Sequence, residues 1–123
     1  MPWKIHVIEN AQAIRAQCSG SVSMDDLEML AIETSYIAKE HGYDKVLLDL
    51  TGGTLAFPSQ SLSALLDVYA ECRMPVTTRI ALVLGSEDWP QSFATVLSTA
   101  KQYGYSVDLL AEDNVKPWLS PLD

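Results

Sequence analysis

Apolar and polar residues alternate over two short segments at the start of the chain. Residues 4–9 and 12–18 show this period of two, with Asn10 between them, and they predict an antiparallel β-hairpin. Two later runs, residues 46–50 and 79–85, are almost continuously apolar, which is typical of strands covered on both faces of a parallel sheet. Val107, Leu109 and Leu110 belong to a last predicted strand.

The segment between the hairpin and the first of these runs has helical periodicity. A helix is expected from about Ser23 to His41, because Ser23 and Asp26 form a capping-box pattern and Gly42 suits the left-handed position that ends a helix. One side of this helix is expected to face the core. That buried stripe consists of Leu27, Leu30, Ala31, Thr34, Ile37 and Ala38.

Three further helices are expected, and residues 51–58 are expected to form the loop before the first of them. The predicted N-terminal caps of these helices are Ser59, Asp88 and Asp113. The element order is therefore ββαβαβαβα. Because helical crossovers imply parallel pairing and right-handed connections, this order predicts an α/β fold in a single domain over residues 1–123. We expect an N-terminal β-hairpin plus three parallel strands in one mixed sheet with flanking helices.

The charge of the chain narrows the classes of partner. Sixteen acidic and eight basic residues give a formal net charge of −8 at pH 7, without a basic stripe, so nucleic acid and anionic membrane surfaces are poor partners. No apolar run approaches the roughly 18 residues that a membrane span needs, and the first residues lack a signal-peptide pattern. Cys18 and Cys72 stand alone in apolar patterns, so we expect them to be small buried side chains that stay reduced. We therefore expect a cytoplasmic protein.

Catalytic chemistry has no recognisable set of residues in this sequence. His6 and His41 stand apart from any activated nucleophile, and the two cysteines and two histidines lack the spacing of a zinc site. We therefore expect a non-enzymatic protein that carries no metal and no other cofactor.

A small-ligand site is expected at the carboxyl ends of the parallel strands, where α/β proteins bind ligands. Residues 51–54 and 86–90 follow two of the strands and would line a cleft, with Phe57 and Trp89 as apolar walls. The alternatives are a flexible turn at 51–54 and a packing role for Trp89. The candidate ligand-binding residues are Asp49, Thr51, Gly52, Phe57, Ser59, Ser86 and Trp89.

A second candidate site lies on the first helix, on the side opposite its buried stripe. Met29, Ile32 and Tyr36 lie there at helical spacing, amid acidic residues, where a helix resting on a sheet normally shows polar side chains. Apolar patches with polar rims often mark protein interfaces, whereas isolated apolar residues on a surface are common. We expect an interface, and a symmetric homodimer is its first interpretation.

The residues around the third predicted strand resemble a known family. Val46-Leu47-Leu48-Asp49-Leu50-Thr51-Gly52, continuing to Leu62-Ser63-Ala64-Leu65-Leu66, is similar to the STAS family of anti-sigma factor antagonists and sulfate-transporter tails. Ser86-Glu87-Asp88-Trp89 and the closing segment Val115–Leu119 resemble its SpoIIAA-like branch. Members of that branch are small stand-alone bacterial domains, grouped by fold with the CRAL-TRIO lipid-transfer proteins. The resemblance implies the same order of strands and helices over nearly the whole chain.

The resemblance also implies a function. In STAS antagonists a partner kinase phosphorylates a serine at the start of the helix that follows this strand. Laid onto this chain, that turn is Pro58-Ser59-Gln60-Ser61 and the phosphorylated serine becomes Gln60, so Ser59 and Ser61 are the remaining candidates. We expect a regulatory module that docks a protein partner or a second copy. The alternative is a carrier or sensor for a small apolar, lipid-like ligand.

Overall fold

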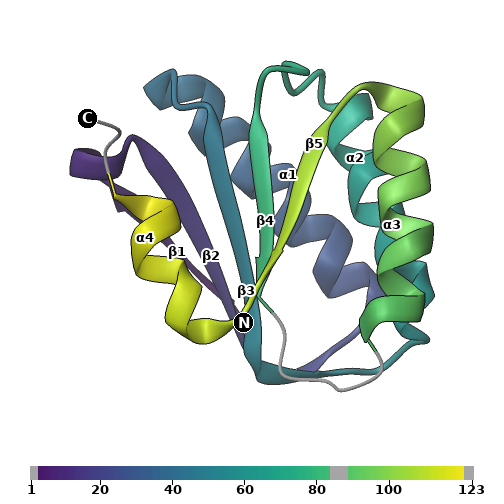
Figure 1. Cartoon of the computed structure of the whole chain (residues 1–123). Coiled ribbons are helices and arrows are strands. Elements are labelled where there is room, and N and C mark those ends of the chain that lie inside the picture. Colours follow the sequence, from purple (N-terminus) through teal and green to yellow (C-terminus); the bar gives the residue numbers. More distant parts are fainter. Residues whose placement is uncertain (1–2, 84–88, 121–123) are drawn as a thin grey trace.

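The computed structural model describes residues 3–83 and 89–120, whose strands form one five-stranded sheet (Figure 1). The strands lie side by side in chain order, with β1 antiparallel to β2 and all other neighbours parallel. The predicted fold class, a hairpin plus parallel strands in one mixed sheet, is confirmed. The strands are β1 (Trp3–Ile8), β2 (Ala13–Val22), β3 (Lys45–Leu55), β4 (Arg79–Val83) and β5 (Ser106–Leu110).

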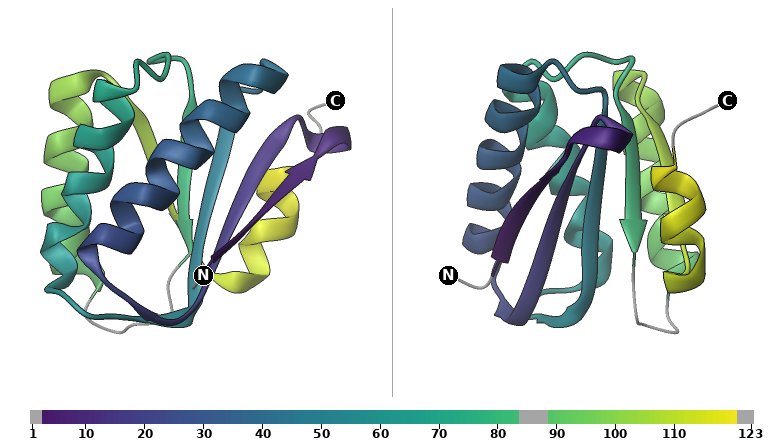
Figure 2. Two further views of the ribbon diagram at one scale, coloured as in Figure 1. Left: turned by 180° about the vertical axis from the view of Figure 1, so that it is seen from behind. Right: turned by 90° about the vertical axis from the view of Figure 1, so that its left-hand side faces the viewer.

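The strand order explains where the helices lie. Right-handed crossovers between successive parallel strands place every crossover helix on the same face of the sheet. α1, α2 and α3 accordingly pack on one face, whereas α4 packs on the other (Figure 2). The helices are α1 (Met24–His41), α2 (Ala64–Glu71), α3 (Trp89–Tyr103) and α4 (Val115–Leu119). Short 3-10 helices are η1 (Glu9–Ala11), η2 (Ser59–Ser63) and η3 (Glu112–Asn114).

The main hydrophobic core lies between the sheet and helices α1 to α3. Because side chains alternate between the two faces of a strand, Val46 and Leu48 of β3 enter this core, whereas Leu47 is buried on the α4 face. The smaller cluster beneath α4 consists of Leu47, Ala81, Val83 and Val115. Cover on both faces thus accounts for the continuous apolar runs of β3 and β4.

Helix α1 begins and ends where its sequence predicts. The Ser23 hydroxyl accepts a hydrogen bond from the Asp26 N–H at 3.1 Å, and the Asp26 carboxylate accepts one from the Ser23 N–H at 3.0 Å. Gly42 follows the helix with φ 70°, in the left-handed region. The predicted stripe faces the core: Leu27, Leu30, Ala31, Thr34 and Ala38 are buried, and Ile37 packs partly buried against them.

The predicted loop at 51–58 is wrong over its first half. β3 continues to Leu55, and its extension pairs with the equally extended end of β2, with Gly52 opposite Ser19. The register shifts just before this pair, where two β3 residues lie opposite one β2 residue in a bulge. A Cβ atom at Gly52 would lie 3.0 Å from the Cys18 carbonyl oxygen. Glycine is therefore required here because two strands approach closely, and not because the chain turns.

The predicted caps of the later helices are also wrong where the structure describes them. Pro58, and not Ser59, is the N-cap residue of η2, and α2 begins only at Ala64. Asn114, and not Asp113, precedes α4. Asp88 lies outside the described residues. Serine and aspartate hydrogen-bond to nearby backbone in several turn geometries, so their presence does not by itself identify the first turn of an α-helix.

Candidate functional site

The structure separates the predicted ligand-binding residues between the two faces of the sheet. Asp49 and Thr51 of β3 lie on the α4 face and line a pocket there. Phe57 instead packs against the main core, on the face that α1 to α3 cover. Gly52 lies inside β3, against the backbone of β2. Since side chains alternate along a strand and the chain turns after β3, residues close in the sequence do not share one cleft.

Asp49 is the centre of a polar cluster on the α4 face. The Arg15 Nη2 group donates to Asp49 Oδ2 at 2.7 Å, which makes an ion pair between β2 and β3. The Thr51 N–H and hydroxyl both donate to Asp49 Oδ1, at 3.0 and 2.6 Å. The Asp49 side chain is 4% exposed and that of Arg15 is 31% exposed. Both carboxylate oxygens are therefore hydrogen-bonded within the protein.

The surroundings of Asp49 determine its charge. Burial opposes ionisation of Asp49 and by itself would raise its pKa. The hydrogen bonds from the Thr51 hydroxyl, Arg15 and the Thr51 N–H act in the opposite direction, as does the positive charge of Arg15. Together they outweigh burial and hold the pKa of Asp49 below its ordinary value. The carboxylate is thus ionised at neutral pH. A carboxylate with a lowered pKa and occupied oxygens is a poor general acid or base, so the cluster is better suited to structure or recognition than to proton transfer.

A pocket of about 500 Å³ opens beside this cluster, within the size range of small-molecule sites. Two of its residues, Asp49 and Thr51, were predicted from the sequence, and the others were not. The alternating pattern over 12–18 shows that Arg15 and Gln17 point away from the core, but nothing local shows that β2 lies beside β3. The pocket is lined by Arg15, Gln17, Asp49, Thr51, Val83, Glu112, Val115 and Lys116.

The remaining predicted site residues are not brought into this pocket. Ser59 and Ser61 lie in η2, which precedes α2. Ser86 lies outside the described residues, and of Trp89 only its position as the first residue of α3 is described. A cleft walled by Phe57 and Trp89 therefore stays a prediction, as does phosphorylation of Ser59 or Ser61.

Cys18 lies next to this region, on the core side of β2. Burial, followed by the nearby charges of Asp49 and Asp26, raises the pKa of the Cys18 thiol to about 11. The thiol is therefore protonated at neutral pH, and a protonated buried thiol is a poor nucleophile. Across residues 3–83 and 89–120, no three His, Cys, Asp or Glu side chains are grouped to hold a metal ion. No described helix combines the length and apolar character that crossing a membrane requires.

Helix α1 carries the second predicted site on its outer face. Met29, Ile32 and Tyr36 are 52%, 48% and 71% exposed, so all three predicted interface residues lie at the surface. They form an apolar stripe along the helix, which we call the α1 stripe. The exposure of these side chains is compatible with an interface, which stays a prediction.

The border of the α1 stripe is acidic. Asp25, Glu28 and Glu40 are exposed on the same helix. Lys39 is also exposed, and its ammonium group donates to the Cys72 carbonyl, which draws it toward the end of α2. Helix α2 packs beside α1, but its exposed carboxylates lie toward α3. Asp67 accepts a hydrogen bond from the Tyr103 hydroxyl, and Glu71 lies near the same hydroxyl.

Comparison with known proteins supports the architecture. No profile of a known protein family matches the chain, and neither does any curated protein sequence. A solved structure of the anti-sigma factor antagonist SpoIIAA in its unphosphorylated form does match, with a TM-score of 0.59 over 94% of each chain and 13% sequence identity. A likeness at this identity concerns the fold, and it confirms the structural part of the resemblance seen in the sequence. The chain therefore has a STAS/SpoIIAA-like fold.

Proposed function

We propose that this chain is a non-enzymatic regulatory module that docks a partner protein on the outer face of α1. The exposed α1 stripe carries the proposal, because Met29, Ile32 and Tyr36 leave a row of apolar surface in water on an otherwise polar helix face. The fold supports it, since the solved structure that the chain resembles is that of an anti-sigma factor antagonist.

The α1 stripe is too small to hold a partner protein by its apolar contacts alone. Covering three half-exposed apolar side chains contributes roughly 3–4 kcal/mol, at about 1 kcal/mol each or slightly more. Association costs about 4–15 kcal/mol in lost freedom of motion. The stripe therefore needs further favourable contacts around it, and the charges of its border decide which partner supplies them.

The acidic border favours a partner of opposite charge. In a symmetric pair of α1 helices, the acidic border of one copy, formed by Asp25, Glu28 and Glu40, would face the acidic border of the other, and such like-charge contacts cost several kcal/mol. We therefore propose a partner whose apolar patch is bordered by lysine and arginine. The symmetric homodimer expected from the sequence pattern is the competing occupant.

The test compares the wild-type chain with Tyr36→Asp and Val76→Asp. Val76 is a matched control, because it is an apolar side chain with 57% exposure that lies outside α1. Proteins captured from the source cells are purified and titrated against each variant by calorimetry. We expect Tyr36→Asp to weaken binding at least tenfold, Val76→Asp to leave it unchanged, and added salt to weaken it, since charges at the border are screened.

Two outcomes contradict this proposal. One is a purified partner that binds all three chains equally. The other is a wild-type dimer in light scattering that becomes a monomer on Tyr36→Asp, which would identify a second copy as the occupant.

We also propose a cytoplasmic location for the module. Cys18 and Cys72 form no disulfide with each other, which suits a reducing compartment. Fractionation of the source cells tests this, and recovery with secreted proteins would contradict it. Bacterial origin, kinship with CRAL-TRIO proteins and binding of a small apolar ligand stay predictions of the sequence resemblance.

A further inference from the structure

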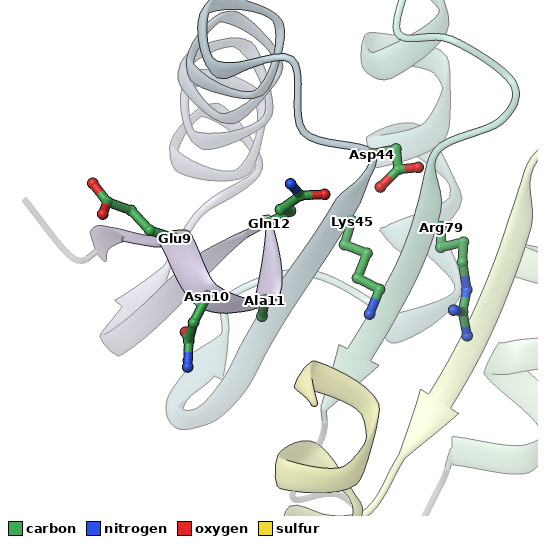
Figure 3. Close-up of a pocket in the computed structure, with 7 residues that line it drawn as sticks. All are labelled: Glu9, Asn10, Ala11, Gln12, Asp44, Lys45 and Arg79. Atoms are coloured by element: carbon green, nitrogen blue, oxygen red, sulfur yellow. The ribbon is translucent and has the colours of Figure 1, made fainter. Parts of the chain in front are cut away.

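The amino end of the sheet holds a pocket that the proposed function does not use. It lies where β3 and β4 begin, beside η1, and has a volume of about 450 Å³, within the range of small-molecule sites (Figure 3). The pocket is remote from the outer face of α1, because its charged side chains lie on the opposite face of the sheet. Its lining residues are Glu9, Asn10, Ala11, Gln12, Asp44, Lys45 and Arg79.

Two cations stand side by side in this pocket. Lys45 and Arg79 are direct neighbours in the register of β3 and β4, and Figure 3 shows both side chains extending in the same direction. Like charges opposite each other on neighbouring strands destabilise a sheet. With sixteen acidic and only eight basic residues in the chain, an opposite pairing would be easy to form. The pairing of two cations therefore calls for a physical reason.

Lys45 is the more costly of the two cations to bury, because it is only 8% exposed. A buried ammonium group is costly unless a partner compensates its charge. The partner within reach is Trp118 of α4: its carbonyl accepts a hydrogen bond from Lys45 Nζ at 3.3 Å. The centroid of its ring lies 5.6 Å from Lys45 Nζ and 5.6 Å from Arg79 Cζ. One indole ring is thus shared between two full positive charges.

One described carboxylate takes part in this arrangement through the ring and not through the cations: Asp108 Oδ2 accepts a hydrogen bond from Trp118 Nε1 at 3.2 Å. No carboxylate oxygen of residues 3–83 or 89–120 lies within 4 Å of Lys45 or Arg79. In Figure 3 the Glu9 carboxylate points away from the two cations, and Asp44, which immediately precedes β3, lies near the backbone ends of the Lys45 and Arg79 side chains. Neither Lys45 nor Arg79 therefore forms an ion pair with a described carboxylate, although Glu9 and Asp44 line the same pocket.

We propose that this pocket binds the phosphate group of a small molecule between Lys45 and Arg79. A dianion placed there converts the repulsion of the pair into two attractions. Arginine offers a planar fork of donors to phosphate oxygens and lysine a point charge, and both are common phosphate ligands. The volume exceeds what a phosphate alone fills, and the amide side chains of Asn10 and Gln12 at its border suit a polar remainder such as a polyol.

The test titrates inorganic phosphate and glycerol phosphate into the isotope-labelled full chain at constant ionic strength. The signal is the indole N–H of Trp118 in NMR spectra, and constant ionic strength removes general screening. We expect saturable shifts with both probes. Tighter binding of glycerol phosphate would assign the rest of the pocket to the organic part, and equal binding would assign the site to the phosphate alone.

Variants locate the binding. We expect Lys45→Met and Arg79→Gln each to weaken it at least tenfold, and Lys101→Gln, which removes an exposed cation from α3, to leave it unchanged. The Arg79→Gln variant keeps the test valid if Lys45→Met does not fold. Thermal unfolding is a second readout, because a ligand of the folded state raises the melting temperature. That rise should be present in the wild type and lost in Arg79→Gln.

Three results overturn the proposal. They are shifts that do not saturate, equal weakening by Lys101→Gln and Arg79→Gln, and binding that appears only in an Asp123→Asn chain. Asp123 lies outside the described residues, a few positions after Trp118, and the third result would mean that its carboxylate occupies the site.

Discussion

The ion pair between Arg15 and Asp49 offers a quantitative test of the polar cluster beneath α4. An Arg15→Met substitution keeps most of the side-chain volume and removes the charge. The Asp49 carboxylate, 4% exposed, then loses a hydrogen bond of 2.7 Å and its counter-ion, and keeps only the two hydrogen bonds from Thr51.

The expected cost follows from the burial of the two partners. Removing one partner of a fully buried ion pair costs about 3–5 kcal/mol. The Arg15 side chain is 31% exposed, so water replaces part of what it supplies. Its Nε atom is buried without a hydrogen-bond partner among the described residues, and removing that atom offsets a further part. We expect a loss of about 2 kcal/mol in the free energy of unfolding at pH 7.

The same substitution should act differently at low pH. The pKa of Asp49 is lower in the folded chain than its ordinary value. The ionised pair therefore contributes stability above the unfolded-state pKa of about 3.9, and this contribution is lost as the pH falls through the folded-state value. Without Arg15 its hydrogen bond and its positive charge no longer lower the folded-state pKa of Asp49, which therefore rises. The cost of Arg15→Met should consequently shrink as the pH falls below about 5.

Urea unfolding between about pH 4.5 and pH 7.5 measures this cost, and 2 kcal/mol corresponds to a midpoint shift of about 1 M. Lys116→Met is the matched control, because Lys116 lines the same pocket and has no carboxylate within 4 Å among the described residues. It should cost less than about 0.5 kcal/mol at every pH. An Arg15→Met midpoint shift that is the same at both ends of the pH range, or no larger than that of the control, would refute the reasoning.

Three further predictions concern stability and reactivity. Gly52→Ala should destabilise the chain by about 1–3 kcal/mol in urea unfolding, because the new Cβ would lie 3.0 Å from the Cys18 carbonyl oxygen, and an unchanged midpoint would contradict the close approach of β2 and β3. Ser23→Ala should cost about 1 kcal/mol in the same assay, because it removes the side-chain acceptor of the capping box, and a loss below about 0.3 kcal/mol would contradict the role of the cap. Cys18 should react with a disulfide reagent at pH 8 much more slowly than Cys72, since its pKa is raised to about 11 and it is buried, and equal rates for the two thiols would contradict this.

Interactions within a few residues explain why α1 could be predicted closely. Ser23 and Asp26 bond each other's backbone across one turn, and Gly42 ends the helix by its own conformational freedom. The predicted role of Gly52 was wrong, because a glycine in a turn and a glycine under a neighbouring strand look alike in sequence. The predicted cap at Ser59 was wrong for a related reason, since serine suits 3-10 turns as well as helix caps.

The two candidate sites also differ in how far the sequence could predict them. The α1 stripe was predictable, because its exposure depends on helical spacing alone, and Met29, Ile32 and Tyr36 lie on the surface as that spacing requires. The pocket around Asp49 was predictable only in part. Its residues come from β2, β3, β4, η3 and α4, and the hydrogen bond between Arg15 and Asp49 joins residues 34 positions apart.

The sequence by itself determined the order of elements and the α/β class, because apolar periodicity and caps act between near neighbours in the chain. Only the tertiary structure decided which strands are neighbours. That choice places Arg15 against Asp49 and Lys45 beside Arg79, and it sets Trp118 of α4 over the second pair. Cross-strand register depends on packing between segments distant in the chain, and no local pattern encodes it. The physical origin of both pockets therefore lies in the pairing of the strands.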